Sequence, residues 1–183
     1  MPKQVDHAAR RAHIADAVLA VVARAGLEEV SVRHVAAEAE VSPGMVQHYF
    51  RTKDELMRAA LERVGAAVQE RLGATGELPP RELVRALFLQ LLPVDGQRAR
   101  EARVAVAFLA HAAVHPEAGD GLRADARALR EHLAAQLDGP AAGPVATGLL
   151  ALVDGLGLQV LTGQLDADDA VATLDVWLDL ALG

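Results

Sequence analysis

Apolar residues recur every three or four positions along most of this chain, which is the period of an amphipathic α-helix. In residues 7–25, for example, Ile14, Val18 and Val21 form one apolar stripe, and Gly26 follows where a helix commonly ends. Prolines, glycines and capping residues separate such segments, and no convincing strand pattern occurs. The pattern predicts an all-α fold of nine helices, at about residues 7–25, 31–39, 43–50, 52–72, 80–92, 95–114, 118–137, 142–163 and 167–181.

The predicted helices divide into a small head and a larger body. Residues 1–58 would form a three-helix head, and residues 59–183 a helical body. Because the boundary falls inside the fourth helix, we expect the two parts to share a helix rather than a flexible linker.

The composition narrows the class of protein. Hydrophobic residues make up 52% of the 183 residues, mostly Ala, Leu and Val, and aromatic residues only 3%, a mix that favours helices. The absence of cysteine excludes disulfides and thiolate chemistry. The polar start of the chain has no apolar signal core, and Asp154 and three glycines interrupt the longest apolar run, residues 145–161. We therefore expect a soluble cytoplasmic protein with no membrane partner.

The net charge of −7 would argue against DNA binding if it were spread evenly. Residues 1–58, however, hold eight Lys or Arg and eight Asp or Glu, so the acidic excess lies entirely in residues 59–183. Since charges are screened over roughly 8 Å at physiological salt, the local charges of the head matter more than the total.

Residues 31–53 carry the most specific signal in the chain. They predict two short helices joined by a tight turn, with Ser31 and Ser42 as N-caps and Pro43 at the first helical position of the second helix. Thr52 is the predicted N-cap of the longer helix that follows. Apolar positions on one side of both helices would fix their crossing by burying Val32, Val35, Ala36, Val41 and Val46. A short helix held rigidly across another suits the DNA major groove.

The side chains left exposed have the chemistry to bind DNA. Gln47 can read adenine through two hydrogen bonds, Met45 can contact a thymine methyl, and His48 and Tyr49 can bond a phosphate or a base edge. Other residues are placed to bind phosphates. The predicted DNA-binding residues are Ser31, Arg33, Ser42, Pro43, Gly44, Met45, Gln47, His48, Tyr49 and Lys53.

Structural roles compete with some of these assignments. Phe50 is expected in the core, Tyr49 could also be a core aromatic, and Arg33 could be a solvated surface charge. The first residues of the chain could form an arm that reaches DNA, or an arm that is simply disordered and solvated; its cations are Lys3, Arg10 and Arg11.

Residues 26–56, GLEEVSVRHVAAEAEVSPGMVQHYFRTKDEL, carry an ordered set of residues that goes beyond a bare helix-turn-helix. The set comprises Gly26, Ser31-Val32, Val35-Ala36, Val41-Ser42, Gly44, Tyr49-Phe50, Lys53 and Leu56. With it, the segment resembles the DNA-binding domain of the tetracycline-repressor (TetR) family. The resemblance implies a homodimeric repressor whose head binds a palindromic operator and whose body binds a small molecule. It also implies that Lys53, which opens the fourth helix, contacts a phosphate.

Two positions depart from the family's pattern. Glu40 stands in the inter-helix turn where glycine is usual, and a left-handed backbone there would cost about 1 kcal/mol. The turn is therefore either slightly rewound or absorbs this cost. Gln47 stands where a phosphate-binding tyrosine is common, so we interpret it as a candidate base reader.

Beyond residue 73 the sequence holds little recognisable chemistry. No P-loop, dinucleotide fingerprint, nucleophile elbow or zinc-protease motif occurs, so we expect neither an enzyme nor a cofactor. His111 and His115 are four residues apart, but neither Glu117 nor His132 has a defined spacing to them, so we predict no metal site.

A ligand pocket in the body should be largely apolar. Asp154, a charge on an apolar helix, could bond a neighbouring helix, pair across a dimer with Gln159, or orient a ligand. The predicted pocket residues are Phe88, Leu92, Phe108, His111 and Asp154.

The last two predicted helices are the most apolar pair in the chain. Left uncovered they would expose a large patch, so we predict a two-fold four-helix interface, with close approach at glycines 148, 155 and 157. The predicted interface residues are Leu149, Leu152, Leu156, Val171, Leu174, Trp177 and Leu178. Alternatively, these helices only complete the monomer core.

Together these features favour a homodimeric, ligand-responsive DNA-binding regulator, most simply a repressor released by a small apolar molecule. Two alternatives stay open: an activator of the same fold, and a helical small-molecule-binding protein that does not act on DNA.

Overall fold

A computed structural model of the chain describes residues 2–137 and 139–182, with the side chains of residues 7–116, 119–137 and 139–182. Within these residues the chain is all-helical, with nine α-helices and no strand, as predicted. The helices are α1 (Pro2–Ala25), α2 (Val32–Glu38), α3 (Pro43–Tyr49), α4 (Lys53–Gly73), α5 (Pro80–Leu91), α6 (Gly96–Val114), α7 (Asp120–Ala134), α8 (Ala142–Leu161) and α9 (Ala167–Leu182); two short 3-10 helices are η1 (Leu27–Glu29) and η2 (Pro116–Gly119).

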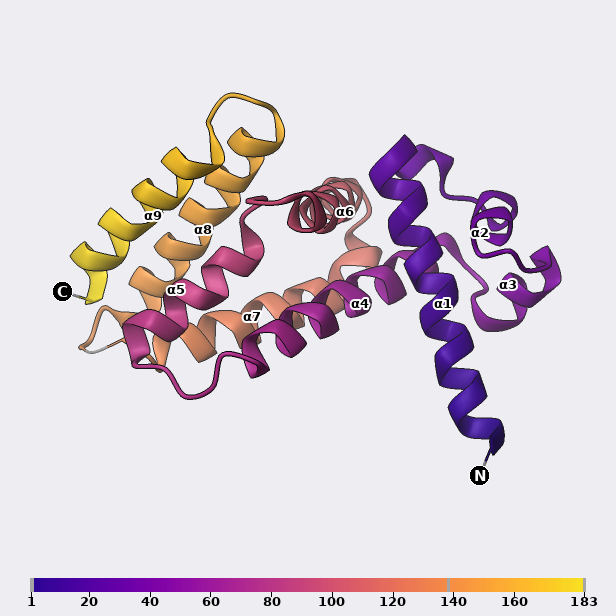
Figure 1. The fold of residues 1–183 in the computed structure, drawn as a ribbon, viewed down its shortest axis with the longest axis horizontal. Coiled ribbons are helices and arrows are strands. Elements are labelled where there is room, and N and C mark those ends of the chain that lie inside the picture. The colour runs from indigo at the N-terminus through magenta and orange to yellow at the C-terminus, as the bar shows by residue number, and fades with distance from the viewer. Residues whose placement is uncertain (1, 138, 183) are drawn as a thin grey trace.

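The helices form an elongated molecule with two ends. The head, α1 to α3, lies at one end, and α8 and α9 lie at the other, with α4 running from the head into the body (Figure 1). Residues 118–137, predicted as a single helix, instead form part of η2, helix α7 and a final turn.

The head is built around an apolar core in which the predicted stripes are buried. Val35, Val46 and Phe50 are at most 1% exposed, and they pack against Ile14 and Val18 of α1. The guanidinium of Arg11 lies 4.5 Å from the centroid of the Phe50 ring and so covers this core from α1.

Local capping bonds set the start of each helix in the head. The Ser31 hydroxyl accepts the His34 N–H (3.2 Å), and the Ser42 hydroxyl accepts the Met45 N–H (3.2 Å). The Thr52 hydroxyl likewise accepts the N–H of Glu55 at 3.1 Å. All three caps were predicted from the sequence.

The turn between α2 and α3 places Glu40 in the left-handed region, at φ 52°. The Val41 N–H donates to the Ala36 carbonyl (2.9 Å) and the Glu40 N–H to the Ala37 carbonyl (3.3 Å), which is the bonding of a Schellman C-cap. The departure from glycine is therefore accommodated by backbone strain and not by a rewound turn.

A second apolar core, assembled from α4, α5, α7, α8 and α9, holds the body together. Helix α4 belongs to both cores, since Leu56, Ala59 and Ala60 lie in the head core and Val68 lies in the body core. Helix α6 also reaches the head core, through Val104. The head and body therefore share packed helices.

Ion pairs between distant residues tie the helices of the body to one another. Arg85 donates two hydrogen bonds to Asp175 (2.6 and 2.9 Å), and this contact lowers the pKa of the Asp175 carboxyl. Arg81 pairs with Asp179 one turn further along α9. These two contacts join α5 to α9.

The N-terminal arm considered from the sequence is not an arm. Helix α1 begins at Pro2, so Arg10 and Arg11 lie within a helix, and Arg11 packs on Phe50 as described above. The side chain of Lys3 lies outside the described part of the chain. The N-terminal part of this helix contacts α3 through His7 and Tyr49 and α4 through Arg11 and Glu62, contacts that the sequence pattern alone does not reveal.

Candidate DNA-binding and ligand-binding sites

The residues predicted to bind DNA lie at the beginnings of α2, α3 and α4 and along the exposed side of α3. Gln47 and His48 are exposed, and Met45 is half-buried beside them. Arg33 is exposed near the start of α2, and Lys53 is half-buried as the first residue of α4. The exposed Ser42, Pro43 and Gly44 form the start of α3, and the exposed Ser31 caps α2. N–H groups and positive dipole ends at helix starts favour phosphate.

Tyr49 serves partly as a core residue. It packs against the head core, and its ring lies 4.6 Å from the His7 ring of α1 and 5.1 Å from the His48 ring. The contact with His7 joins residues 42 positions apart in sequence. No local pattern predicted it, because it depends on the path of α1 beside α3.

The body contains a cavity between α4, α5, α6 and α7. It has two adjoining parts of about 690 and 620 Å³, which share Gln69, Leu87, Asp125 and Leu129 in their linings. Leucine and valine side chains dominate the walls, and the polar groups on them come from Arg58, Glu62, Gln69, Asp125, His132 and Gln136. Such a mixture of apolar wall and few polar groups is typical of small-molecule sites.

Of the residues predicted for the pocket, only Phe108 lines this cavity. Phe88 and Leu92 are fully buried in the packed core of the body and line neither part of the cavity. His111 instead bonds Asp54 of α4, its Nε2 lying 3.0 Å from Oδ1. Asp154 lies on α8, which does not contribute to this cavity.

The cavity-lining residues of α4 were not predicted from the sequence, because two apolar stripes run along that helix. One stripe includes Leu56 and Ala60 and packs in the head core. A second stripe, which includes Leu61, Val64 and Val68, faces the cavity. The sequence signal was present in this second stripe, but periodicity does not distinguish a wall of a cavity from a packed core.

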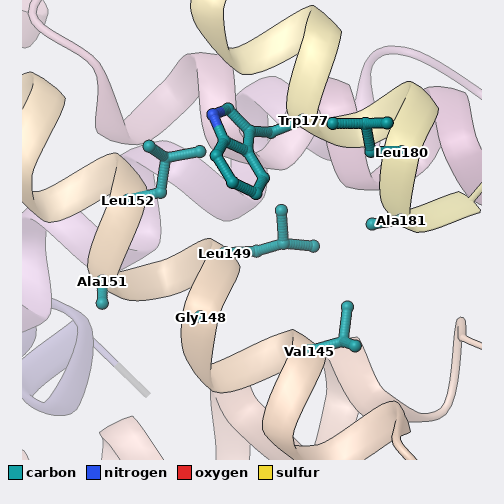
Figure 2. A pocket seen from close by; sticks show the side chains of 8 residues that line it. All are labelled: Val145, Gly148, Leu149, Ala151, Leu152, Trp177, Leu180 and Ala181. Atoms are coloured by element: carbon teal, nitrogen blue, oxygen red, sulfur yellow. The ribbon is translucent and has the colours of Figure 1, made fainter.

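A separate groove of about 600 Å³ lies between α8 and α9 (Figure 2). Trp177 and Leu180 of α9 face Leu149 and Leu152 of α8 across it. Trp177 is 50% exposed and Leu180 72%, so this end of the molecule presents a large apolar surface to solvent.

Four of the seven residues predicted for a dimer interface are in the monomer core. They pack in the core of the body and are at most 6% exposed, although Leu149 also lines the groove between α8 and α9: Leu149, Leu156, Leu174 and Leu178. Leu152 and Val171 are half-buried, and Trp177 is exposed. Gly157 is also buried, with Pro93 beside it, whereas Gly148 and Gly155 have open space where a side chain would be. Apolar residues at helical spacing identify which side of a helix is buried, but not whether the same chain or a second chain covers that side.

Helix α8 combines an apolar composition with an open outer side. The helix has 20 residues and a mean hydropathy of 1.6 in its most apolar 18-residue window, so by length and composition alone it could cross a membrane. Core helices of soluble proteins meet the same two criteria. Only 28% of that window is buried. Asp154 lies on the exposed side, where partial burial of its carboxyl nevertheless raises its pKa.

The paired histidines do not form a metal site with other described residues. The rings of His111 and His115 lie 4.4 Å apart, but no group of three His, Cys, Asp or Glu side chains within the described part is placed to hold a metal. The side chain of Glu117, a third candidate ligand, lies outside that part.

Comparisons with known proteins agree with this architecture. Residues 9–60 match the family of bacterial regulatory proteins named tetR, and residues 80–183 match the C-terminal region of BetI-type transcriptional repressors. The regulator BetI of Paraburkholderia xenovorans is 31% identical over 193 aligned positions, covering 100% of this chain and 98% of that protein.

Solved structures are similar over nearly the whole chain. A transcriptional regulator from Rhodococcus sp. Rha1 has a TM-score of 0.84 and 36% identity, covering 94% of this chain and 95% of that one. The multidrug binding protein EbrR, solved with ethidium, has a TM-score of 0.69 and 29% identity, covering 92% and 98%. With its helix-turn-helix head and BetI-type body, the chain belongs to the TetR family, and it is a DNA-binding transcriptional regulator, a class of protein without enzymatic activity.

Proposed function

We propose that this protein is a homodimeric repressor that binds a palindromic operator through α3 and releases it when a small, largely apolar molecule enters the cavity between α4 and α7. The observation that carries the proposal is the double role of α4. Its first half packs in the head core, and residues from Arg58 to Gln69 line the cavity. A ligand in the cavity would therefore touch the helix that supports the DNA-binding head.

In the DNA-bound state, α3 of each protomer would enter the major groove, with half-sites about 34–36 Å apart. Gln47, Met45 and His48 would read bases, since they lie on the exposed side of α3. Arg33, Lys53 and the two capping serines would bind phosphates and fix the register of the helix on the duplex.

The dimer would form at the groove between α8 and α9. A second copy would cover Trp177, Leu180 and the open side of α8 around Gly148 and Gly155. The small residues let two helices approach closely, and the uncovered apolar surface supplies the driving force.

The effector would be a small, largely apolar molecule. Leucine-rich walls favour an apolar body, while the carboxylates of Glu62 and Asp125, which outnumber the guanidinium of Arg58 in the same lining, favour a ligand with positive charge. Ethidium, present in the EbrR structure, has both properties and is a suitable first probe.

The test combines DNA selection with ligand binding. Wild-type protein should enrich palindromic duplexes from a random pool and bind them as a dimer by sedimentation; failure to enrich any sequence would contradict the proposal. Separately, DNA-free protein should bind ethidium, and Leu129→Trp, which fills the middle of the cavity, should abolish that binding while selected-duplex binding persists. Ala124→Trp, at an exposed position of the same helix α7, is the matched control. Undiminished ethidium binding by Leu129→Trp would place the ligand elsewhere.

A further inference from the structure

The end of α6 is bonded to the start of α4. His111 Nε2 lies 3.0 Å from Asp54 Oδ1, and the two side chains are 18% and 42% exposed. Asp54 is in the first turn of α4 and His111 in the last turn of α6. The carboxylate of Asp54 lies at a helix start, where negative charge complements the helix dipole.

A stronger contact joins the same two helices near the other end of α4. Arg71 donates to both carboxylate oxygens of Glu101, at 3.0 and 2.7 Å, and its Nε donates to Gln90 at 2.6 Å. The hydrogen bond from Arg71 to Glu101 raises the pKa of the guanidinium. A bidentate, charge-assisted pair that is largely shielded from water resists separation more than a single half-exposed bond does.

The larger part of the cavity, of about 690 Å³, lies along α4 between these two contacts. Its lining residues on α4 run from Arg58 to Gln69, all between Asp54 and Arg71 in sequence, whereas the other part extends past Arg71 to Leu72 and Gly73. On α6 the lining residue is Phe108, which precedes His111 by one turn and is almost completely buried. A molecule that displaces Phe108 would therefore act on the helix turn that carries His111.

We infer that the Asp54–His111 contact is a positioning contact that couples the cavity to the DNA-binding head. It holds the first turn of α4, and with it Lys53, in the DNA-binding position, and it opens before the Arg71–Glu101 contact when the cavity is occupied. The inference rests on the proposed function and assigns the residues through which its regulation passes. Because coupling is reciprocal, DNA bound at the head must in turn stabilise the end of α6.

This reciprocity permits a test that needs no effector. The probe is a duplex that wild-type protein has selected from a random pool, and the readouts are its affinity and the amide exchange of residues 104–114. The duplex should slow exchange in these residues of wild-type protein, although none of them belongs to α1, α2 or α3. His111→Ala should abolish this protection and weaken duplex binding about five- to tenfold.

Two variants distinguish coupling from a general loss of structure. His111→Gln keeps a side-chain N–H that can reach Asp54 and should retain both the affinity and the protection. Leu109→Ala, an exposed position on the same helix, should behave like wild type. In a double-mutant cycle, Asp54→Ala should add little to His111→Ala, since either change alone removes the contact.

Each other outcome has a definite meaning. If His111→Ala leaves both affinity and protection unchanged, the inference is overturned. If affinity falls but the duplex still protects residues 104–114, His111 only stabilises the fold and the inference is again overturned. If wild-type protein selects no duplex at all, the proposed function itself has failed, and this is visible before any variant is made.

Discussion

The head and the body are both helical, yet different contacts hold them together. In the head each cap bonds a backbone N–H three residues away, and one short turn sets the crossing of α2 and α3. In the body, Arg85–Asp175 and Arg81–Asp179 join residues 90 and 98 positions apart. Local contacts can be recognised in a sequence, whereas long-range ones depend on how the helices are arranged.

The predicted DNA-binding surface of the head and the cavity of the body differ in the same way. The predicted DNA-binding residues lie close together in sequence, within residues 31–53. The cavity is assembled from four helices, and its lining extends from Arg58 to Gln136. A reader of the sequence can therefore recognise what the head does, but not what the body binds.

The largest expected effect tests whether the two cores unfold separately. Phe50→Ala should destabilise the protein by about 3–5 kcal/mol, because it removes a fully buried ring and the surface on which Arg11 packs. Urea denaturation measures the loss, and amide exchange should accelerate mainly in residues 9–60. Phe88→Ala is the matched change in the body core and should accelerate exchange mainly in residues 80–182. If each variant accelerated amide exchange equally in residues 9–60 and 80–182, the two cores would unfold as one cooperative unit, joined by α4 and α6.

The groove at the far end of the body gives the next largest effect. Trp177→Ala should weaken self-association by about 2 kcal/mol or more, roughly 30-fold, if this half-exposed ring is central to the interface. Sedimentation over a range of concentrations measures the dimer constant. Val114→Ala removes a more exposed apolar side chain from α6 and should have no effect. An unchanged dimer constant for Trp177→Ala would exclude the groove as the interface.

Two head variants should separate base reading from phosphate binding. Gln47→Ala is expected to cost about 1–3 kcal/mol, and only at particular base pairs. Lys53→Ala should weaken binding to every sequence and reduce the logarithmic salt slope by about one. Binding to single-base variants of a selected duplex at several salt concentrations measures both. Should Gln47→Ala lose the same affinity on all sequences, Gln47 would be a backbone contact.

The smallest effect concerns the strained turn of the head. Glu40→Gly should stabilise the protein by about 1 kcal/mol, because glycine adopts φ 52° without steric cost. Thermal unfolding measures the gain. Ala37→Gly, at an exposed position within α2, should have the opposite sign and cost about 1 kcal/mol. A loss of stability in Glu40→Gly would show that the Glu40 side chain contributes more than its backbone strain costs.

Several sequence-based predictions for the head are confirmed at the level of single residues. The caps Ser31, Ser42 and Thr52 bond as predicted, and Phe50 is buried. Of the two alternatives for the turn at Glu40, the structure has the left-handed backbone. The DNA contacts themselves stay predictions, since they depend on a partner that the fold alone does not contain.

For the body, the sequence determined the helices and which of their sides are apolar, because the period of 3.6 residues is a local property. Only the tertiary structure decided what covers each apolar side. It assigned Leu156, Leu174 and Leu178 to the monomer core, left Trp177 exposed, and opened a cavity beside Phe108. The physical reason is that burial depends on which helices meet, and helices far apart in sequence meet through the sum of many weak contacts that no local pattern encodes.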